Sequence, residues 1–496
     1  MQRSRLPGVF IYSFFCVLTL ALFSNTITKP FLSDDYDVLY RLTVQKQFFI
    51  EGFFRPLSDL TIYLCYLIGG LQPAVFNVFN LLVHATSCFI LYRFCLVCPL
   101  FPDTGRQWIA WTASVLFLIY PFHSESVIWM VGRASAISNL FGFLSLLLAF
   151  SNLPKGWRYF AVCACYFTGL ASYETIFLLP VILFVFQYQP HKSFRSYLPL
   201  YSWLSVTLIL HVLVRNWYAK SFAGQYGDKI FMADLSVYAG RFLKVTGRLL
   251  LPPSVNSALL AGLYIGGILV IAVVSFLLLK QKKEARVPYL KLLAAVLVAC
   301  IIPGMFGINT QTAEGDRLIY FASFFFISWL SFFLWLIPRK PLRNVAFALV
   351  SLYFLLFLGK SIKDWNTAGT IVQRLLNRIQ EERSNYASLG FVNIPEEENG
   401  AFVFRVGFPQ ALLINKIDTS GITLLRKMTS GEAAQLPPAI KPVTNGGILY
   451  LAPGTQIQSD SVISIVHPEE KDTITTKYRP FQQILYWNKK DLVQLY

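Results

Sequence analysis

Two adjacent carboxylates, Asp34 and Asp35, follow the first apolar run of the chain by a few residues. A carboxylate at a membrane surface can take the proton from an acceptor hydroxyl, while cations or a metal hold a departing phosphate. Sugar transfer from a phosphate-linked lipid donor has these requirements, so either acid is a candidate general base. The alternative is that both acids are solvated loop charges.

A second set of polar residues lies between Tyr120 and Arg133, after the third long apolar run. His123 and Glu125 alternate there, and such groups are costly to keep at a membrane boundary without a role. His-x-Glu offers two metal ligands, or a hydrogen-bonded pair that positions the loop. A divalent metal bound by Asp34, His123 and Glu125 stays an open alternative, because it requires the fold to bring two loops together.

Two further motifs open later apolar runs. Glu174 follows Tyr173 at the start of one run, and Glu314-Gly-Asp316-Arg317 precedes another. A guanidinium that enters the membrane beside these acids suits a lipid phosphate, because its charge is permanent and its donors form a fork. The neighbouring carboxylates could instead neutralise Arg317 in a structural ion pair.

The composition predicts a polytopic α-helical membrane protein. Of 496 residues, 55% are hydrophobic, only 14% are charged, and the mean hydropathy is +0.53. Soluble proteins carry about 25% charged residues and lack recurring apolar runs of about 20 residues. The eight cysteines lie in or beside apolar segments, so they indicate small packing residues rather than a disulfide framework. The same interpretation is favoured over a redox or zinc pair for Cys95 and Cys98.

Eleven apolar runs are long enough to be membrane spans, and the first follows Arg3 and Arg5 without a clear cleavage site. The runs lie near 7–25, 75–98, 107–122, 134–151, 157–173, 174–188, 195–215, 258–280, 287–306, 318–337 and 342–359. With a cytoplasmic N-terminus, the inner segments carry 15 Lys and Arg against two acids, whereas the outer segments are nearly balanced. This bias supports the predicted count and places the candidate acids and the C-terminus outside.

The chain is predicted to have a transmembrane domain at 1–360, an amphipathic linker helix at 361–385 and a small β-rich domain at 386–496. After residue 385, Gly, Pro and Asn punctuate short runs that have strand character. These runs lie at 402–406, 447–451, 462–466 and 482–487.

Two outer loops, at 26–74 and 216–257, are expected to contain helices that lie in the membrane interface. The apolar stretch 57–70 in the first loop is too short to span. In the second loop, Arg241, Lys244 and Arg248 share one face of the expected helix 235–251. That spacing favours a stripe that faces lipid headgroups or phosphates, or a solvated helix face.

Several weak motifs occur in an order that resembles the GT-C superfamily of glycosyltransferases. The resemblance is strongest to the transmembrane O-mannosyltransferases that carry tetratricopeptide repeats, and it covers about residues 7–360. The motifs are Asp34-Asp35, Arg55-Pro-Leu-Ser-Asp-Leu, Gly70-Leu-Gln-Pro, Phe76-Asn-Val-Phe-Asn-Leu-Leu-Val-His84, Pro121-Phe-His-Ser-Glu125 through Gly132-Arg133-Ala, Tyr173-Glu174 before Leu179-Pro180, and Asp316-Arg317-Leu-Ile-Tyr.

The resemblance implies a GT-C-like fold and an inverting hexosyltransferase that uses a polyprenyl- or dolichyl-phosphate-linked sugar. It implies that Asp34 or Asp35 is the base, with Asp34 preferred as the first acid of the pair. It further implies that Arg317 and Arg133 hold the donor phosphate. The residues implied to line the same cavity are His123, Glu125, Glu174 and Asp316.

The chain departs from these relatives after the transmembrane region, where the β-rich tail stands in place of the repeats. The resemblance therefore does not establish that the acceptor is a protein. We expect the acceptor to be a lipid, a glycan or a protein. We expect the protein in a bacterial inner membrane, with its active site and C-terminus on the periplasmic side and no nucleic acid as partner.

The main competing interpretation is a lipid or polysaccharide transporter or flippase. Such proteins usually show paired halves or charges near the bilayer midplane, whereas the acids here cluster at one surface and no halves repeat. An O-antigen-type polymerase or ligase shares the donor class but would tend to use His and Arg rather than a carboxylate pair. A receptor or scaffold is the remaining alternative.

Overall fold

The structure is a computed structural model that describes residues 8–220, 234–427, 447–451, 462–466, 473–475, 481–488 and 490–494. Arg3 and Arg5, and residues 221–233 of the predicted second outer loop, lie outside the described residues. The chain divides into two compact units. The first contains Met1–Lys29, Arg41–Asn366 and Asn399–Ala401, and the second contains Pro30–Tyr40, Thr367–Glu398 and Phe402–Tyr496.

The first unit is built from helices. Proline occupies the first turn of α3, α4, α9 and α10. Its fixed φ favours a helix there, and its missing N–H costs no hydrogen bond because N–H groups in the first turn have no partner within the helix. The α-helices are α1 (Gly8–Leu22), α3 (Pro56–Gly69), α4 (Pro73–Val97), α5 (Arg106–Leu118), α6 (Ser124–Val127), α7 (Arg133–Ala149), α8 (Lys155–Leu170), α9 (Leu179–Gln187), α10 (Leu198–Ala219), α12 (Leu235–Arg248), α13 (Ser257–Gln281), α14 (Arg286–Ala299), α15 (Ile301–Phe306) and α16 (Tyr320–Leu336). Two more helices, α2 (Asp34–Thr43) and α17 (Lys340–Asn385), have residues in both units.

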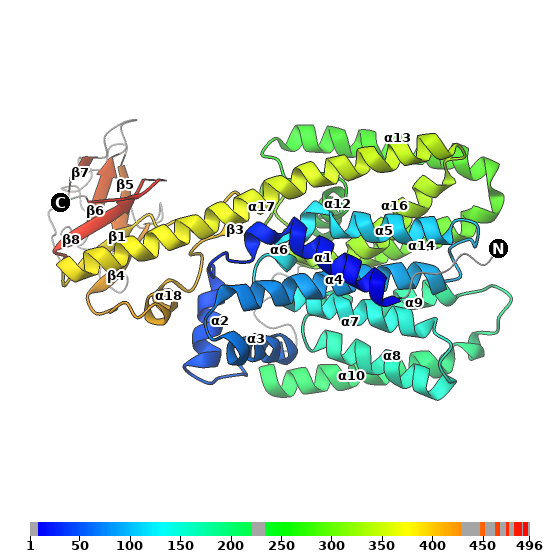
Figure 1. The fold of residues 1–496 in the computed structure, drawn as a ribbon, viewed down its shortest axis with the longest axis horizontal. Coiled ribbons are helices and arrows are strands. Elements are labelled where there is room, and N and C mark those ends of the chain that lie inside the picture. The colour runs from blue at the N-terminus through cyan, green and yellow to red at the C-terminus, as the bar shows by residue number, and fades with distance from the viewer. Residues whose placement is uncertain are drawn as a thin grey trace. The chain divides into compact units, whose positions relative to one another are not determined.

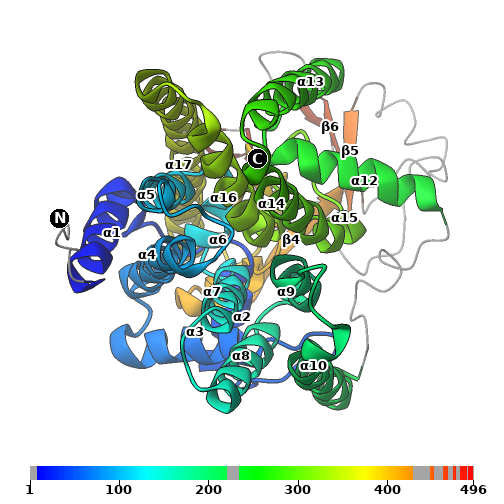
Figure 2. The same ribbon diagram turned by 90° about the vertical axis from the view of Figure 1, so that its right-hand side faces the viewer.

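The long helices of this unit run side by side, and Figures 1 and 2 show them along and down their axes. The core helix α16 packs against α5 and α14, and almost all of its residues are buried. By contrast, α13 buries only Ser275 and leaves its apolar side chains exposed. Helices with exposed apolar faces are those that a lipid environment requires.

Each of the eleven predicted apolar runs lies on a helix or on two consecutive helices. Within the described residues, six helical segments are long and apolar enough to cross a membrane. They are Pro73–Val97, Leu198–Ala219, Ser257–Gln281, Lys283–Phe306, Asp316–Leu336 and Lys340–Asn385. A multi-pass helical membrane protein is therefore confirmed, and the count of eleven spans stays a prediction.

The second unit contains a seven-stranded sheet. Its strand order is β7-β6-β5-β4-β1-β8-β9, with β1 parallel to β4 and β8 and the outer pairs antiparallel. The central strand β1 is buried along its whole length, which suits a strand paired on both edges. The strands are β1 (Leu389–Val392), β4 (Ile422–Lys427), β5 (Gly447–Leu451), β6 (Val462–Val466), β7 (Thr473–Thr475), β8 (Gln483–Trp487) and β9 (Leu492–Gln494). The short helix α18 (Phe408–Ile414) also belongs to this unit, and the prediction of a small β-rich part is confirmed.

One predicted strand, at 402–406, is wrong. The short strands β2 (Glu397–Glu398) and β3 (Ala401–Phe402) pair with each other, and the chain leaves strand geometry after Phe402. The backbone N–H groups of Val403 and Phe404 donate to the carbonyls of Glu396 and Pro395, at 2.9 and 3.1 Å. These bonds hold Val403 and Phe404 against residues 395 and 396, and the burial of both side chains accounts for the apolar pattern without pairing in the seven-stranded sheet.

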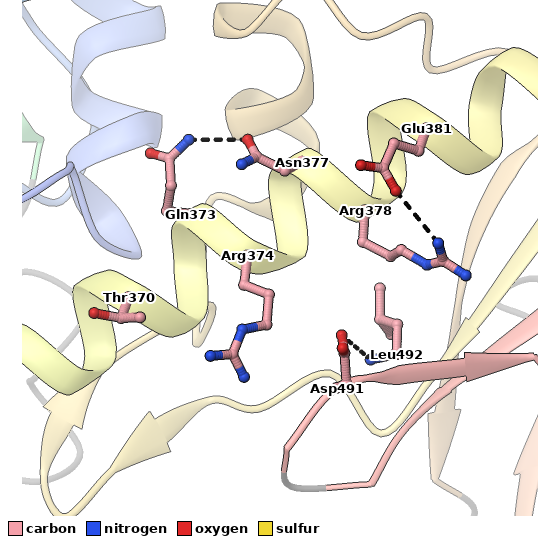
Figure 3. Close-up of a pocket in the computed structure, with 8 residues that line it drawn as sticks. All are labelled: Thr370, Gln373, Arg374, Asn377, Arg378, Glu381, Asp491 and Leu492. Atoms are coloured by element: carbon pink, nitrogen blue, oxygen red, sulfur yellow. Dashed lines mark hydrogen bonds and ion pairs between the residues drawn. The ribbon is translucent and has the colours of Figure 1, made fainter.

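The expected linker 361–385 is the second part of α17, which continues without a break from Lys340 to Asn385. The part of α17 in the second unit borders a polar cleft of about 620 Å³ (Figure 3). Its polar groups bond largely to each other and to nearby backbone: Arg374 donates to the Lys490 carbonyl at 2.6 Å, and Gln373 donates to Asn377 at 3.0 Å. The cleft is lined by Thr370, Gln373, Arg374, Asn377, Arg378, Glu381, Asp491 and Leu492.

Candidate active site

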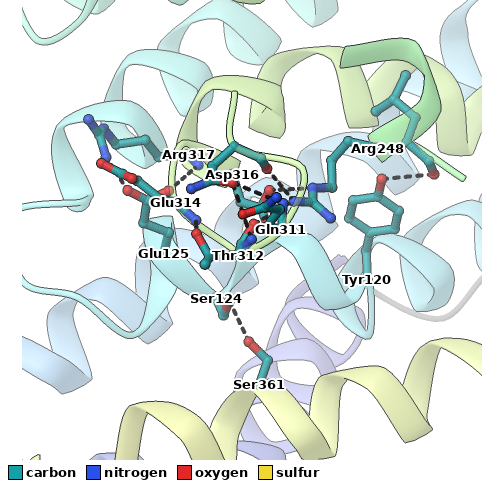
Figure 4. Close-up of polar contacts among 12 residues, drawn as sticks. Tyr120, Ser124, Glu125, Arg248, Gln311, Thr312, Glu314, Asp316, Arg317 and Ser361 are labelled. Atoms are coloured by element: carbon teal, nitrogen blue, oxygen red, sulfur yellow. Dashed lines mark hydrogen bonds and ion pairs between the residues drawn. The ribbon is translucent and has the colours of Figure 1, made fainter. Parts of the chain in front are cut away.

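In the first unit, the loop before α7 meets the 3₁₀ turn that opens α16 (Figure 4). Glu125 on α6 accepts the backbone N–H of Arg317 at 2.9 Å through one carboxylate oxygen, and its other oxygen forms an ion pair with the Arg317 guanidinium. The Glu125 side chain is 1% exposed and that of Arg317 is 21% exposed. The carboxylate is therefore enclosed while part of the cation stays accessible, and the guanidinium also lies over the Trp129 ring.

Gly132 makes the approach of α7 to Glu125 possible. A Cβ atom at this position would lie 1.9 Å from the Glu125 carbonyl oxygen, which is far inside van der Waals contact. Any side chain at residue 132 would therefore displace the segment that carries the carboxylate.

Asp316, beside Arg317 in sequence, has a different partner. The nearest atoms of Asp316 and Arg248 are 2.9 Å apart, both side chains are almost fully enclosed, and Arg248 comes from the last turn of α12. The Arg248 guanidinium also donates to the carbonyls of Asn309 and Thr312, each at 2.6 Å (Figure 4). This arginine therefore holds both the loop before α16 and the acid at its start. The loop turns at Gly307 and Gly315, whose φ angles of 81° and 91° suit glycine.

Arg133, at the start of α7, is fully buried. It donates to the Phe76 carbonyl at 2.9 Å and to the Cys65 sulfur at 3.4 Å, and its guanidinium lies 4.8 Å from the centre of the Phe79 ring. The described contacts of Arg133 thus tie α7 to α3 and α4.

The two residues of the His-x-Glu motif have separate partners. His123 is buried, with its Nε2 atom 2.6 Å from the Ser323 hydroxyl and its ring against Phe117, Tyr120 and Tyr320. Across the part of the chain that the structure describes, no three His, Cys, Asp or Glu side chains are grouped so that they could hold a metal ion.

Glu174 belongs to a third polar contact in the first unit. Its carboxylate pairs with Arg215 at the end of α10, and Arg55 lies close by with its guanidinium 4.7 Å from the centre of the Tyr173 ring. Sequence reasoning did not identify Arg215 or the pairing of Arg248. The available signal was an arginine near the end of an otherwise apolar segment, where an unpaired charge is costly.

Asp34 and Asp35 lie in the second unit, in the first turn of α2, where the helix N-terminus favours negative charge. Asp35 is fully buried, and its Oδ2 atom accepts the backbone N–H of Leu32 at 2.9 Å. The Asp34 side chain is 28% exposed; its Oδ2 atom accepts from the Ser33 hydroxyl at 3.1 Å and from Arg405 at 3.3 Å. Burial raises the pKa of the neighbouring Tyr36 hydroxyl, which stays protonated at neutral pH.

The candidate residues therefore form separate groups. Glu125 and Arg317 are in contact, and Asp316, which precedes Arg317 in sequence, pairs with Arg248. Glu174 pairs with Arg215, and His123 lies in an aromatic cluster of the same unit. The two aspartates of the first loop belong to the second unit, where Arg405 is the partner that sequence reasoning missed.

Parts of the chain are similar in sequence to known transferases. Protein O-mannosyl-transferase TMTC3 of Homo sapiens is 39% identical over 99 residues, which make up 20% of this chain and 10% of that protein. Protein O-mannosyl-transferase TMTC2 of Mus musculus is 25% identical over 237 residues, which make up 42% of this chain and 28% of that protein. These matches thus cover less than a third of each relative's own length.

Among solved structures, the arabinofuranosyltransferase AftD from Mycobacteria aligns over 82% of this chain and 31% of that chain, with 13% identity and a TM-score of 0.41. No protein-family model matches the chain. Over the matched stretches, the chain is similar to the protein O-mannosyl-transferases, which confirms the resemblance predicted from the order of its motifs.

Proposed function

We propose that the protein is an inverting glycosyltransferase that moves a sugar from a polyprenyl-phosphate-linked donor to an acceptor hydroxyl on the outer face of the membrane. The similarity to protein O-mannosyl-transferases carries this proposal. The accessible Asp34 carboxylate supports it, because inverting transfer needs one base that can reach the acceptor.

Asp34 is the base in this proposal. Its carboxylate takes the acceptor proton while the acceptor oxygen bonds to the anomeric carbon, and the bond from that carbon to the phosphate oxygen breaks. The phosphate leaves with the bonding electrons, and a single displacement inverts the anomeric configuration. Asp35 is less suited, because its carboxylate is enclosed and already accepts a backbone N–H.

Arg317 is the proposed ligand of the departing phosphate. Its guanidinium is partly exposed and is oriented by Glu125, so it can meet a phosphate without a large rearrangement. Arg133 is enclosed by backbone, sulfur and aromatic contacts, so we assign it a supporting role at the start of α7.

An apolar cavity of about 510 Å³ supports a lipid-linked donor. It lies between α12 and α13 and reaches Arg248 and Thr310, which belong to the polar cluster before α16. Of the three cations on the face of α12, Arg248 is buried in its ion pair and Arg241 donates to the Met305 carbonyl at 2.7 Å. Lys244 remains exposed at the cavity, where an ammonium can attract a lipid phosphate.

The test is a transfer assay with the full chain in membranes. We expect labelled sugar to pass from a polyprenyl-phosphate-mannose donor to an endogenous acceptor, detected by mass spectrometry of envelope lipids, glycans and proteins. A nucleotide-linked sugar supplied alone to washed membranes should give no transfer. Movement of the intact lipid across the bilayer with no transfer would instead support a flippase.

We further propose a bacterial inner membrane, with the second unit on the periplasmic side. The excess of basic residues in the predicted inner segments supports this orientation. In intact cells, Ser384→Cys should react with a membrane-impermeant maleimide, because Ser384 is exposed near the end of α17. Wild-type protein is the control, because any labelling of it comes from its own eight cysteines. Labelling of the variant only after lysis would place the second unit on the cytoplasmic side instead.

A further inference from the structure

Residues 402–408 of the second unit, here called the brace, hold the residue that precedes Asp34. The Ser33 backbone N–H donates to the Val403 carbonyl at 2.8 Å, and the Val406 backbone N–H donates to the Ser33 hydroxyl oxygen at 3.1 Å. One turn further along α2, the Tyr36 ring stacks on Phe404 at 6.2 Å. The start of α2 is thus held through backbone, hydroxyl and ring contacts from a segment about 370 residues away in sequence.

The conformation of Ser33 shows that these contacts are specific. Its φ angle of 45° lies in the left-handed region, which a serine adopts only when its surroundings enforce it. Gly407 makes room for this arrangement: its own φ is 82°, and a Cβ atom there would lie 2.5 Å from the Ser33 carbonyl oxygen. The backbone of the brace can therefore lie against the turn before Asp34 only because residue 407 has no side chain.

Arg405 of the brace contacts the carboxylate itself. Its Nη2 atom lies 3.3 Å from Asp34 Oδ2, and its guanidinium is held 4.0 Å from the centre of the Phe402 ring. The Ser33 hydroxyl donates to the same oxygen at 3.1 Å. Within the described residues, no hydrogen bond to Asp34 Oδ1 is found, so the two donors hold the carboxylate through one oxygen.

We propose that Arg405 is a positioning residue, and that the brace orients Asp34 for its role as base. This inference rests on the proposed function, because it assigns Arg405 an effect on transfer. It gives the second unit a direct part in the reaction, since the carboxylate and the cation that orients it both belong to that unit. If Arg405 had only a structural role, it would instead stabilise the whole sheet, and its loss would affect the sheet as well as the turn before Asp34.

Hydrogen exchange of the full chain in detergent tests the brace independently of activity. In Arg405→Gln, we expect backbone amides of residues 32–37 and 403–406 to exchange at least about fivefold faster, because a charge-assisted contact is lost. Exchange in β1 and β8 should stay unchanged. Arg374→Gln is the matched control, since it removes a guanidinium of the same unit that donates to the Lys490 carbonyl.

Kinetics test the positioning role. Arg405→Gln should lower kcat by about tenfold with KM within about twofold, because a misplaced base slows the chemical step without weakening binding. Arg405→Lys keeps a cation on the Phe402 ring and should recover kcat to within about threefold of wild type.

The outcomes separate the two proposals. Unchanged exchange at residues 32–37 would overturn the brace whatever the activity, and faster exchange spread over β1 and β8 would reduce Arg405 to a structural residue. Faster local exchange with unchanged kcat would overturn the positioning role. Faster local exchange in a protein whose wild type transfers no sugar would overturn the proposed function and leave the brace in place.

Discussion

Asp34→Asn should lower the rate of sugar transfer by at least about 100-fold, and by up to about 10⁴-fold, the range that general base catalysis contributes. The amide oxygen can still accept from Ser33 and Arg405, so the local structure should persist. The amide cannot take the proton of the acceptor hydroxyl. Turnover per folded molecule, measured with a polyprenyl-phosphate-linked donor in membranes of equal protein content, checks this result.

Two other substitutions of aspartate by asparagine control for this change. Asp103→Asn alters a carboxylate that is 88% exposed and pairs with Arg106, so it should leave transfer unchanged. Asp35→Asn should leave most of the turnover in place, because its amide oxygen can still accept the Leu32 N–H and Asp35 is not the proposed base. Near-normal turnover in Asp34→Asn, at equal expression and insertion, would remove Asp34 from the mechanism.

Asp316→Ala should lower the free energy of unfolding by about 3–5 kcal/mol, which is the usual cost of leaving one charge of a buried ion pair alone. Arg248 would keep its positive charge in an enclosed site and hold only the carbonyls of Asn309 and Thr312. Thermal or denaturant unfolding in detergent measures this loss. Release of the loop before α16 should also reduce transfer, because Arg317 follows Asp316 directly.

The double variant Arg248→Met with Asp316→Leu removes both charges and should regain part of the lost stability. Glu51→Ala breaks an exposed pair with Lys220 and should cause no measurable change. A wild-type-like unfolding transition in Asp316→Ala would show that the enclosed pair does not hold this loop.

The sequence allowed the helical framework to be predicted because long apolar runs have few structural options in a membrane. Every predicted run lies on helices, and the strands at 447–451, 462–466 and 483–487 follow punctuation by turn residues. The segment 402–406 misled because Phe402, Val403 and Phe404 are buried outside the seven-stranded sheet, where backbone hydrogen bonds to residues 395 and 396 take the place of a sheet partner.

The site could be predicted only in part, because its partners are set by long-range folding. Glu125 and Arg317 were both candidates from local motifs, yet their contact joins residues 192 positions apart. Adjacent acids such as Asp34 and Asp35 look equivalent in sequence, and only burial distinguishes them. No local pattern links Arg405 to Asp34, because the two residues are 371 positions apart.

Gly132 has a consequence for how this chain can change during evolution. Because a Cβ atom there would collide with the Glu125 backbone rather than with a flexible side chain, no single substitution at residue 132 can be absorbed by a rotamer change. A homologue that replaces this glycine must therefore also carry an altered backbone at residues 125–131. Residue 132 should accordingly stay glycine and change more slowly than the apolar residues around it.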